Sequence, residues 1–509
     1  MATIPGRDVA ASSGRAPSGV DLALFSGGDE RVFLNPVTGR TKYGTPHGCA
    51  EDEAWFSSST GTAISARGYA AAAAAWQKFF AGSQTLEEGF DEIRQKLTQI
   101  FGIEGTQAIL AGSGTEAVLI SLALARMVCR ASVTAIIVGC AETGRGVSAA
   151  AAGLHFVRQA AFAAVIPGDR LAGFENMDIH VDTVAIRDRG GALRPPGEVD
   201  AELAQKAETA RRAGRDVIIH RLEASKTGHS APSLAVLDQL CKAAPGQILV
   251  LADACQLRCS AAHVQSLLQR GYLVSLTGSK FAGGPPFAGA LLVPPAVMQR
   301  LRPMPLPAGL AAYSAQLDWP PMLRPMLSPG LLPLANIGLA LRWQAALAEI
   351  ERFFLCPADL RRSIFAHFRQ EVAQRVTATS CLDLLPPPPE SAESWGHSIL
   401  CIAMRHTDGR CLDMAEAAVV QRRLREGLDA GMGAAKRFHL GQPVAVGGAA
   451  VLRVCASAAL VNRVADAVAA GLPFVAALAP VSEDLADLFT AWPAAVMAAA
   501  AVSAKIEAP

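Results

Sequence analysis

The chain has 509 residues, of which 51% are apolar, and its 46 basic residues are almost balanced by 45 acidic ones. A chain of this composition can bury a large core and has no electrostatic reason to seek nucleic acid. We therefore predict a soluble globular protein with no nucleic-acid or membrane partner. The 11 cysteines form no CxxC pair, and no histidine has zinc-finger spacing, so neither a metal site nor a disulfide framework is predicted. Reduced thiols and a cytoplasmic location are expected.

The N-terminal part of the chain precedes the first strand of the predicted sheet. Residues 1–30 do not begin with a basic stretch followed by an apolar one, so we expect a disordered lead-in instead of a secretory signal. Residues 31–104 are expected to contribute to a small domain and to cover the active site as a lid. Two polar stretches within them, Tyr43–His47 and Ser57–Thr60, either line a substrate pocket or form turn-rich loops, and the loop interpretation is favoured.

Residues 105–333 alternate short apolar runs with longer helical ones. This alternation predicts an α/β fold with a mostly parallel sheet that carries helices on both faces. The first helix is expected at Thr115–Arg130. The predicted strands are Ala108–Ala111, Thr134–Gly139, Asp216–His220, Ile248–Ala252, Leu273–Leu276 and Gly289–Val293.

The residues that follow several of these strands are polar. Ligands of open parallel sheets bind at the carboxyl ends of the strands, so these residues are candidates for a binding site. Strand ends are also polar in proteins that bind nothing there, and that alternative stays open. The polar runs are Ser113–Glu116, Glu142–Thr143, Glu223–Gly228, Asp253 with Gln256, and Ser279–Lys280.

A proline-rich boundary at Pro294–Pro333 separates this large domain from a smaller α+β domain over residues 334–480. In the small domain we predict helices at Leu334–Phe354 and Met414–Gly427 and strands at Ser398–Met404 and Val451–Cys455. The last segment, residues 481–509, contains the apolar stretch Leu488–Ala504. Because Pro493 interrupts it, a packed helix is favoured over a membrane span.

Two charged residues carry the chemistry. Lys280 lies between an apolar strand and a glycine-proline turn, where a rigid element could present it to a carbonyl cofactor. Asp253 ends another apolar strand, and a buried carboxylate needs a cationic partner. That partner is a protonated pyridine nitrogen or Arg258, unless Asp253 caps the next helix. The turn Gly112–Thr115 could bind a phosphate at a helix start, although N-capping by Ser113 or Thr115 explains it as well.

Together these features resemble fold-type I pyridoxal-phosphate enzymes, in particular the class V aminotransferase and cysteine desulfurase group. The resemblance is good over residues 105–300 and loose in the C-terminal domain. The matching stretches are Ala111–Ala117 (family T-S-G-A-T-E-A), His220–Gly228 (S-x-x-T-G), Asp253–Gln256 (D-A-x-Q), Thr277–Lys280 (S-G-H-K), Gly283–Leu292 (G-P-x-G-x-G-x-L) and Val451–Val454.

The resemblance implies pyridoxal 5'-phosphate as cofactor, an amino acid as substrate and a homodimer. It also assigns roles to individual residues. Lys280 would form the aldimine, Asp253 would pair with the pyridine nitrogen, Gln256 and Ser225 would lie near the phenolic oxygen, Gly114, Thr115, Thr277 and Ser279 would hold the phosphate, and Arg453 would bind the substrate carboxylate. For Arg453 a structural ion pair is the alternative.

Three positions depart from the family pattern. Thr143 occupies the place of the residue that stacks on the cofactor ring, unless His155 or Phe156 takes it. Ser279 replaces the histidine before the lysine, so acid-base work falls on Lys280. The loop expected at Lys436–Pro443 lacks the nucleophilic cysteine of desulfurases, and Cys411 is only a weak substitute.

Aminotransfer from an amino acid is the leading prediction for the reaction. The alternatives are β-elimination, desulfuration or decarboxylation, and a cofactor-binding protein without turnover.

Overall fold

The computed structural model describes residues 18–129, 132–328, 335–427 and 436–507. The expected lead-in at residues 1–17 and the ends of two predicted helices, Arg130 and Leu334, lie outside the described residues. The helices are α1 (Gly19–Leu24), α2 (Ala66–Phe80), α3 (Leu86–Phe101), α4 (Gly114–Val128), α5 (Val147–Ala151), α6 (Pro196–Arg212), α7 (Leu234–Ala243), α8 (Ala261–Gln269), α9 (Pro295–Met298), α10 (Ile337–Leu355), α11 (Ala358–Thr377), α12 (Met414–Glu426), α13 (Ala458–Ala469) and α14 (Phe474–Glu507). The strands are β1 (Ala54–Phe56), β2 (Gln107–Ala111), β3 (Ser132–Val138), β4 (Asp178–Val184), β5 (Asp216–Leu222), β6 (Ile248–Ala254), β7 (Leu273–Thr277), β8 (Gly289–Val293), β9 (Leu382–Leu384), β10 (Ile399–Met404), β11 (Phe438–Val446) and β12 (Ala449–Cys455).

The large domain is built on a sheet whose described strands have the order β2-β8-β7-β6-β5-β3-β4. Strands β3 to β7 are mutually parallel, and β8 runs against both of its neighbours. The predicted α/β fold with a mostly parallel sheet is therefore confirmed. Strand β4 was not predicted, because as an edge strand it has polar residues on its exposed side and shows no apolar run.

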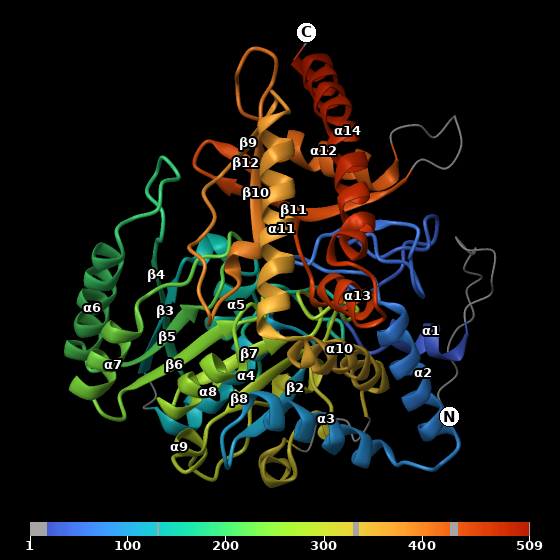
Figure 1. Cartoon of the computed structure of the whole chain (residues 1–509). Helices are drawn as coiled ribbons and strands as arrows, with labels where there is room; N and C mark the ends of the chain where they lie inside the picture. Colours follow the sequence, from blue (N-terminus) through green and yellow to red (C-terminus); the bar gives the residue numbers. More distant parts are fainter. Residues whose placement is uncertain (1–17, 130–131, 329–334, 428–435, 508–509) are drawn as a thin grey trace.

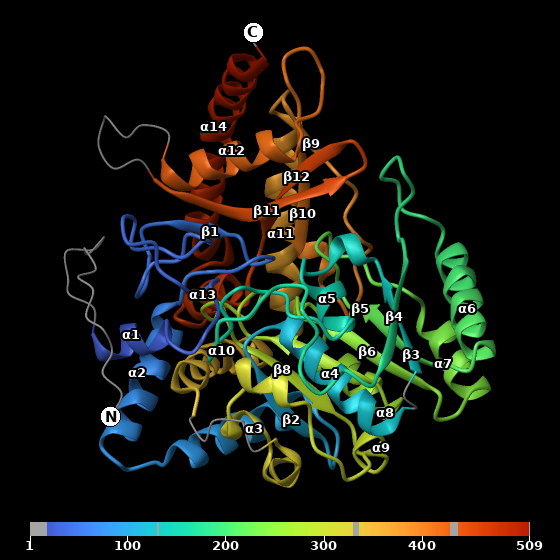
Figure 2. The same cartoon turned by 180° about the vertical axis from the view of Figure 1, so that it is seen from behind.

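Alternate residues of each strand are buried on opposite faces of this sheet. Ala108 and Leu110 of β2 pack into one core cluster, which includes residues of α3, α6, α7, α8 and α10. Ile109 and Ala111 pack into a second cluster with α4 and α5. The helices thus cover both faces (Figure 1, Figure 2), which explains why every residue of the central strands β5 and β7 is buried.

A second sheet, with the strand order β1-β11-β12-β10-β9, forms the small domain. The N-terminal segment joins it, because β1 pairs in parallel with β11 through Ala54 and Phe438. Figure 1 shows this domain above the large sheet, with α11 and α14 beside it. Strand β11 was not predicted, because a bulge between Gly441 and Val444 interrupts its alternation; the loop expected at Lys436–Pro443 is therefore wrong.

The ends of the described chain also differ in part from expectation. Residues Gly19–Leu24 form α1, capped by Ser18, so the expectation of disorder is wrong for this stretch. The apolar C-terminal stretch packs as predicted, since Leu488, Trp492 and Ala495 of α14 are fully buried.

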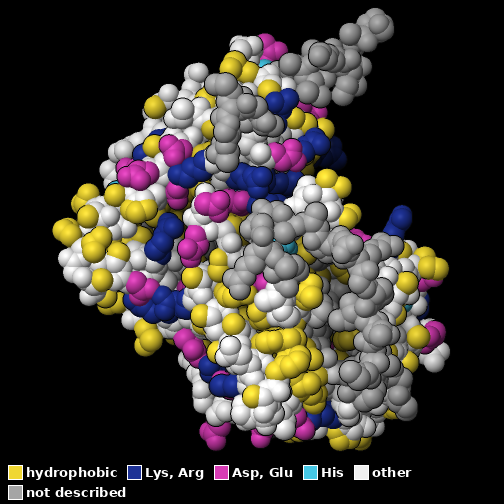
Figure 3. All heavy atoms as spheres, turned by 90° about the vertical axis from the view of Figure 1, so that its right-hand side faces the viewer, with side chains coloured by type: hydrophobic (Ala, Val, Ile, Leu, Met, Phe, Trp, Pro, Cys, Tyr) yellow, Lys and Arg dark blue, Asp and Glu magenta, His cyan; other side chains and the backbone are white. Residues whose placement is uncertain are grey.

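Among the described residues, no helix meets the length and apolarity that crossing a membrane requires. On the face shown in Figure 3, acidic and basic side chains are interspersed, as the small net charge suggests.

Candidate active site

A cavity of about 460 Å³ opens where β3, β5, β6 and β7 end. All the residues to which the sequence assigned a site role line it, although they come from both domains. They are Gly114, Thr115, Thr143, Ser225, Asp253, Gln256, Thr277, Ser279, Lys280 and Arg453.

The start of α4 forms one end of the cavity. Ser113 caps the helix by accepting a hydrogen bond from the Glu116 N–H at 3.3 Å. The N–H groups of Gly114 and Thr115 have no acceptor among the described residues, so the positive end of the helix can bind an anion there. Gly114 is required for this approach, because a Cβ at that position would lie 2.3 Å from the Cys255 sulfur.

Two hydroxyl residues predicted beside the phosphate differ in what they contact. Thr277 donates to the Cys255 carbonyl at 2.7 Å and so holds the turn after β6 in place. Ser279 is half-buried, lines the cavity and has no hydrogen-bond partner in the described parts of the chain. The hydroxyls that stay free to donate to an anion are therefore those of Ser279 and Thr115.

Asp253 faces this cavity from β6, and Lys280 faces it from the turn that follows the neighbouring strand β7. The Asp253 carboxylate accepts a hydrogen bond from the Cys255 N–H at 3.1 Å but forms no ion pair with any described residue. Both structural alternatives for Asp253 are wrong. Arg258 instead donates to Ser58, Ser398 and the Ala456 carbonyl, and α8 is capped by Ser260.

The two residues predicted near the phenolic oxygen are held by the protein. Gln256 donates to the Ser59 carbonyl at 3.1 Å, while its own side-chain oxygen is buried without a partner. The Ser225 hydroxyl donates to Glu142 and is therefore not free to donate to a ligand. Burial opposes ionisation of Glu142, but hydrogen bonds from Ser225 and Thr227 and the Arg187 guanidinium hold its pKa below the ordinary value.

Arg453 lies on β12 and is only 2% exposed. Its guanidinium donates to the Gln442 carbonyl and the Thr60 hydroxyl, both at 2.9 Å, and makes longer contacts of 3.4 and 3.5 Å with the carbonyls of Lys226 and Ser59. All these partners are neutral, so the alternative of a structural ion pair is wrong. Burial lowers the pKa of Arg453, and a carboxylate in the cavity would compensate its buried charge.

The three candidates for the residue that stacks on the cofactor ring, Thr143, His155 and Phe156, differ in whether they line the cavity. Thr143 lines the cavity, and its hydroxyl donates to the Cys140 carbonyl at 2.9 Å. Of the two aromatic alternatives, Phe156 lines the cavity and stacks on Tyr313 with ring centroids 5.2 Å apart. His155 is turned to the Tyr313 hydroxyl, 2.8 Å from its Nδ1, and does not line the cavity.

Several lining residues were not given a role from the sequence. Tyr43, Ser59 and Thr60 reach the cavity, and the two N-terminal stretches are also turn-rich loops, so the two interpretations do not exclude each other. The basic residues Lys42, Arg145 and Lys226 line it as well. Lys226 belongs to a polar run that the sequence marked as a strand end, but Lys42 and Arg145 had no signal that could place them there.

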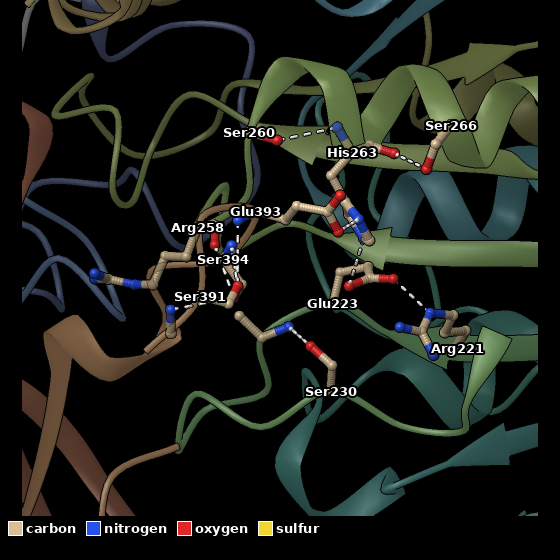
Figure 4. Close-up of polar contacts among 12 residues, drawn as sticks. Arg221, Glu223, Ser230, Arg258, Ser260, His263, Ser266, Ser391, Glu393 and Ser394 are labelled. Atoms are coloured by element: carbon tan, nitrogen blue, oxygen red, sulfur yellow. Dashed lines mark hydrogen bonds and ion pairs between the residues drawn. The ribbon is translucent and has the colours of Figure 1, made fainter. Parts of the chain in front are cut away.

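A second cluster of charges, formed by Arg221, Glu223 and His263, does not line the cavity and is paired within itself. Figure 4 shows the Glu223 carboxylate directed at both Arg221 and His263, with Glu393 on the other side of the imidazole. The His263 ring nitrogens lie 3.2 Å from Glu223 and 3.4 Å from Glu393. Glu393 belongs to the segment before β10, whose backbone bonds to that of Arg258 and Ser260. This cluster therefore joins the two domains.

No family model matches the sequence, and no curated protein is similar to it. Solved structures do resemble the fold. The cysteine desulfurase CsdA from Escherichia coli has 13% identity and a TM-score of 0.53 over 91% of this chain and 99% of its own. A mutant of C-DES, with glycine covalently linked to its PLP cofactor, has 14% identity and a TM-score of 0.52 over 82% of this chain and 97% of its own. Mouse CSAD has 13% identity and a TM-score of 0.51 over 87% of this chain and 85% of its own.

The chain has the fold of fold-type I pyridoxal-phosphate enzymes. This is the fold that the sequence resemblance predicted. At such low identity the likeness is one of fold, and the chemistry has to be argued from the cavity itself. The homodimer and the cytoplasmic location stay predictions.

Proposed function

We propose that this protein binds pyridoxal 5'-phosphate, attached to Lys280, and uses it to transform an amino acid, with aminotransfer as the leading reaction. The observation that carries the proposal is the pair Lys280 and Asp253. These opposite charges line one cavity, Asp253 from β6 and Lys280 from the turn after the adjacent β7, and neither has an ion-pair partner among the described residues. An unpaired carboxylate and an amine so placed are what the pyridine nitrogen and the aldehyde of the cofactor require.

The rest of the cavity fits the same group. The free N–H groups of Gly114 and Thr115 and the Ser279 hydroxyl supply donors for its phosphate. Gln256 keeps its NH₂ group on the Ser59 carbonyl, and its buried side-chain oxygen, which has no partner, can accept a hydrogen bond from a donor in the cavity. Phe156 provides an apolar ring surface at the same cavity.

Bound pyridoxal phosphate supplies an electron sink for the negative charge that develops at the α-carbon of the substrate. The protein then has two tasks. Arg453 holds the substrate carboxylate, exchanging its long contacts with the Ser59 and Lys226 carbonyls for charge-assisted bonds. The Lys280 amine takes the α-proton and returns it, since Ser279 cannot relay a proton as an imidazole would.

The cysteines argue against desulfuration. Cys255 is the one cysteine that lines the cavity, and burial raises the pKa of its thiol well above the ordinary value, which makes it a poor nucleophile. Cys411, the weak substitute proposed from the sequence, lies outside the cavity. Proton transfer without sulfur attack supports aminotransfer over desulfuration.

Cofactor attachment is tested on purified protein supplied with pyridoxal phosphate. The protein should absorb visible light, lose this band on borohydride reduction and carry the label on the peptide that contains Lys280. Lys280→Ala should keep the wild-type melting temperature and lose the label, whereas Lys242→Ala, a change at an exposed lysine, should keep both. A label that persists in Lys280→Ala would overturn the assignment.

The reaction is tested in a single turnover with a panel of amino acids. Aminotransfer leaves the amino group on the cofactor as pyridoxamine phosphate and releases a keto acid. Release of sulfide or carbon dioxide, with the original absorption band restored, would instead support the lyase alternatives. If the protein binds the cofactor but no product forms, the alternative of a cofactor-binding protein without turnover is supported.

A further inference from the structure

The cavity carries more positive charge than the cofactor and one carboxylate require. Its described lining residues include six basic ones, Arg31, Lys42, Arg145, Lys226, Lys280 and Arg453, but three acidic ones, Glu30, Glu142 and Asp253. Arg31 is paired with Asp29, 2.6 Å away, and Glu142 is paired with Arg187 at the same distance. After Lys280 and Asp253 are assigned to the cofactor and Arg453 to a carboxylate, Lys226, Arg145 and Lys42 remain.

Lys226 is the innermost of these three. It is half-buried, whereas Lys42 and Arg145 are exposed at the rim of the cavity. Its backbone is fixed on both sides, by the bond of its N–H to the Glu142 carbonyl at 3.1 Å and by the contact of its carbonyl with Arg453. Its ammonium group makes one long contact, 3.5 Å from the Ala141 carbonyl, and no ion pair with a described residue.

The surroundings of Lys226 are unfavourable for a cation. Burial, together with the positive charges of Arg453, Lys280 and Arg145, lowers the pKa of Lys226 to about 8, although the negative charge of Glu142 opposes this shift. Burial and the neighbouring Arg31 likewise lower the pKa of Lys42, which also feels Arg145. Like charges held together at one cavity destabilise the protein unless an anion occupies the space between them.

The cofactor phosphate is not that anion. Its donors lie at the start of α4, which touches Cys255 after β6 and Gly289 at the start of β8. Lys226 follows β5, and its N–H bonds to Glu142 in the segment after β3. In the order of the sheet, β5 and β3 lie on one side of β6, and β8 lies on the other side. It lies next to Arg453, on the side where the substrate enters in the function proposed above.

We propose that the amino-acid substrate carries a second acidic group on its side chain, and that Lys226 binds this group while Arg145 and Lys42 reinforce the positive potential at the rim. This inference rests on the proposed function and adds the substrate class to it. Arg453 and Lys226 then bind the two ends of one dianionic substrate, which fixes its orientation and disfavours neutral amino acids, since these leave Lys226 uncompensated.

The test uses cofactor-loaded protein and probes that need no turnover. Calorimetry compares succinate, glutarate and 3-phosphonopropionate with butyrate, which has one charge. At least one of the three should bind about tenfold more tightly than butyrate or better, because its second charge forms a charge-assisted bond with Lys226. Equal binding of all four compounds would overturn the proposal.

Three variants make the test specific for Lys226. Lys226→Met should abolish the preference for the dianion, Lys226→Arg should retain it, and Lys242→Met, at an exposed position on α7, should behave as wild type. All of them should keep the absorption band of the cofactor. If Lys226→Met loses the cofactor, this lysine serves the phosphate and the proposal fails; if the wild type never binds cofactor, the proposed function fails instead.

A pH series adds a readout that a structural role would not produce. Because Lys226 loses its charge as pH rises through about 8, the wild-type preference for the dianion should fall between pH 7.5 and 9.5, to an extent reduced by the bound anion itself. In Lys226→Arg the preference should persist, since arginine stays charged over this range. Identical pH profiles for the two proteins would contradict a direct contact between Lys226 and the second acidic group.

Discussion

The candidate cavity and the cluster around His263 both contain charged residues from the same short stretch of the chain, residues 221–226. The charges of the cluster are paired with opposite charges, whereas Lys226 in the cavity is not. In the cluster, Glu223 is placed between Arg221 and His263, so the buried charges compensate one another. Three residues further on, Lys226 faces a cavity in which the positive charges of Arg453, Lys280 and Arg145 act on it more strongly than the negative charge of Glu142. Buried charges that are matched hold the protein together, whereas unmatched ones mark the place of a ligand.

The largest expected effect separates activity from stability at the cavity. Lys280→Ala should lower turnover at least about 10³-fold, because proton transfer by a positioned side chain contributes about 10² to 10⁴-fold and the cofactor attachment is lost as well. The free energy of unfolding of the cofactor-free protein should change by less than about 0.5 kcal/mol, since Lys280 has no ion pair in the described chain. Stopped-flow assays and urea titrations measure the two quantities. A large loss of stability would mean that Lys280 is structural.

The matched cluster should respond in the reverse way. Glu223→Gln removes the carboxylate shared by Arg221 and His263, and breaking a buried pair lowers the free energy of unfolding by about 3 to 5 kcal/mol. Urea titration of the cofactor-free protein measures this loss. Arg212→Gln, at an exposed surface pair with Glu208, is a control that should cost about 0 to 1 kcal/mol. If Glu223→Gln is as stable as the wild type, the paired charges of the cluster do not stabilise the protein, and the contrast with the cavity is wrong.

The pH dependence of stability sharpens the comparison further. The hydrogen bond with Glu223, aided by the charges of Glu223 and Glu393, raises the pKa of His263 against the effects of burial and Arg221. A raised pKa in the folded state stabilises the protein fully below the unfolded value of about 6.5, and this contribution is lost as pH rises through the folded value. The stability difference between wild type and His263→Asn should therefore be larger at pH 6 than at pH 9. His220, whose pKa burial lowers to about 4, destabilises the protein as pH falls below the unfolded value of about 6.5, but it does so equally in both proteins and cancels in the difference.

The smallest expected effect is the contribution of the unpaired Lys226 to the stability of the protein. Lys226→Met should raise the free energy of unfolding of the ligand-free protein by about 0.5 to 1 kcal/mol, because a like charge leaves the cavity. Differential scanning calorimetry with and without succinate measures it, and succinate should stabilise the wild type more than the variant. A destabilised variant would show that Lys226 belongs with the matched charges.

The sequence predicted best what is apolar and continuous along the chain. Strands β5 to β8 are buried on both faces and each contains a short apolar run, so both they and the polar residues that end them could be located. The resemblance to a known family then placed Lys280, Asp253 and Arg453 at one site, and the structure brings them to one cavity. Their chemical roles remain proposals.

What the sequence could not predict depends on segments that meet only in the folded chain. Lys42 and Arg145 come from separate loops, and nothing in either loop shows that it faces Lys226. His263 and Glu393 meet because the segment before β10 pairs with the residues before α8, and a histidine on a helix gives no sign of this. Likewise, whether a hydroxyl is free or is bonded within the protein, as that of Ser225 is to Glu142, depends on distances in the folded chain that sequence spacing does not fix.

The turn Ser57–Thr60 has a consequence for how the cavity comes into being during synthesis. Ser58 bonds to Arg258 and to the Ala456 carbonyl, and Ser59 bonds to Gln256, so the partners of this early turn lie 200, 398 and 197 residues further along the chain. Contacts between residues so far apart form late, because the intervening chain must fold first. The N-terminal wall of the cavity can therefore be completed only after the chain has been synthesised as far as Ala456, just beyond β12.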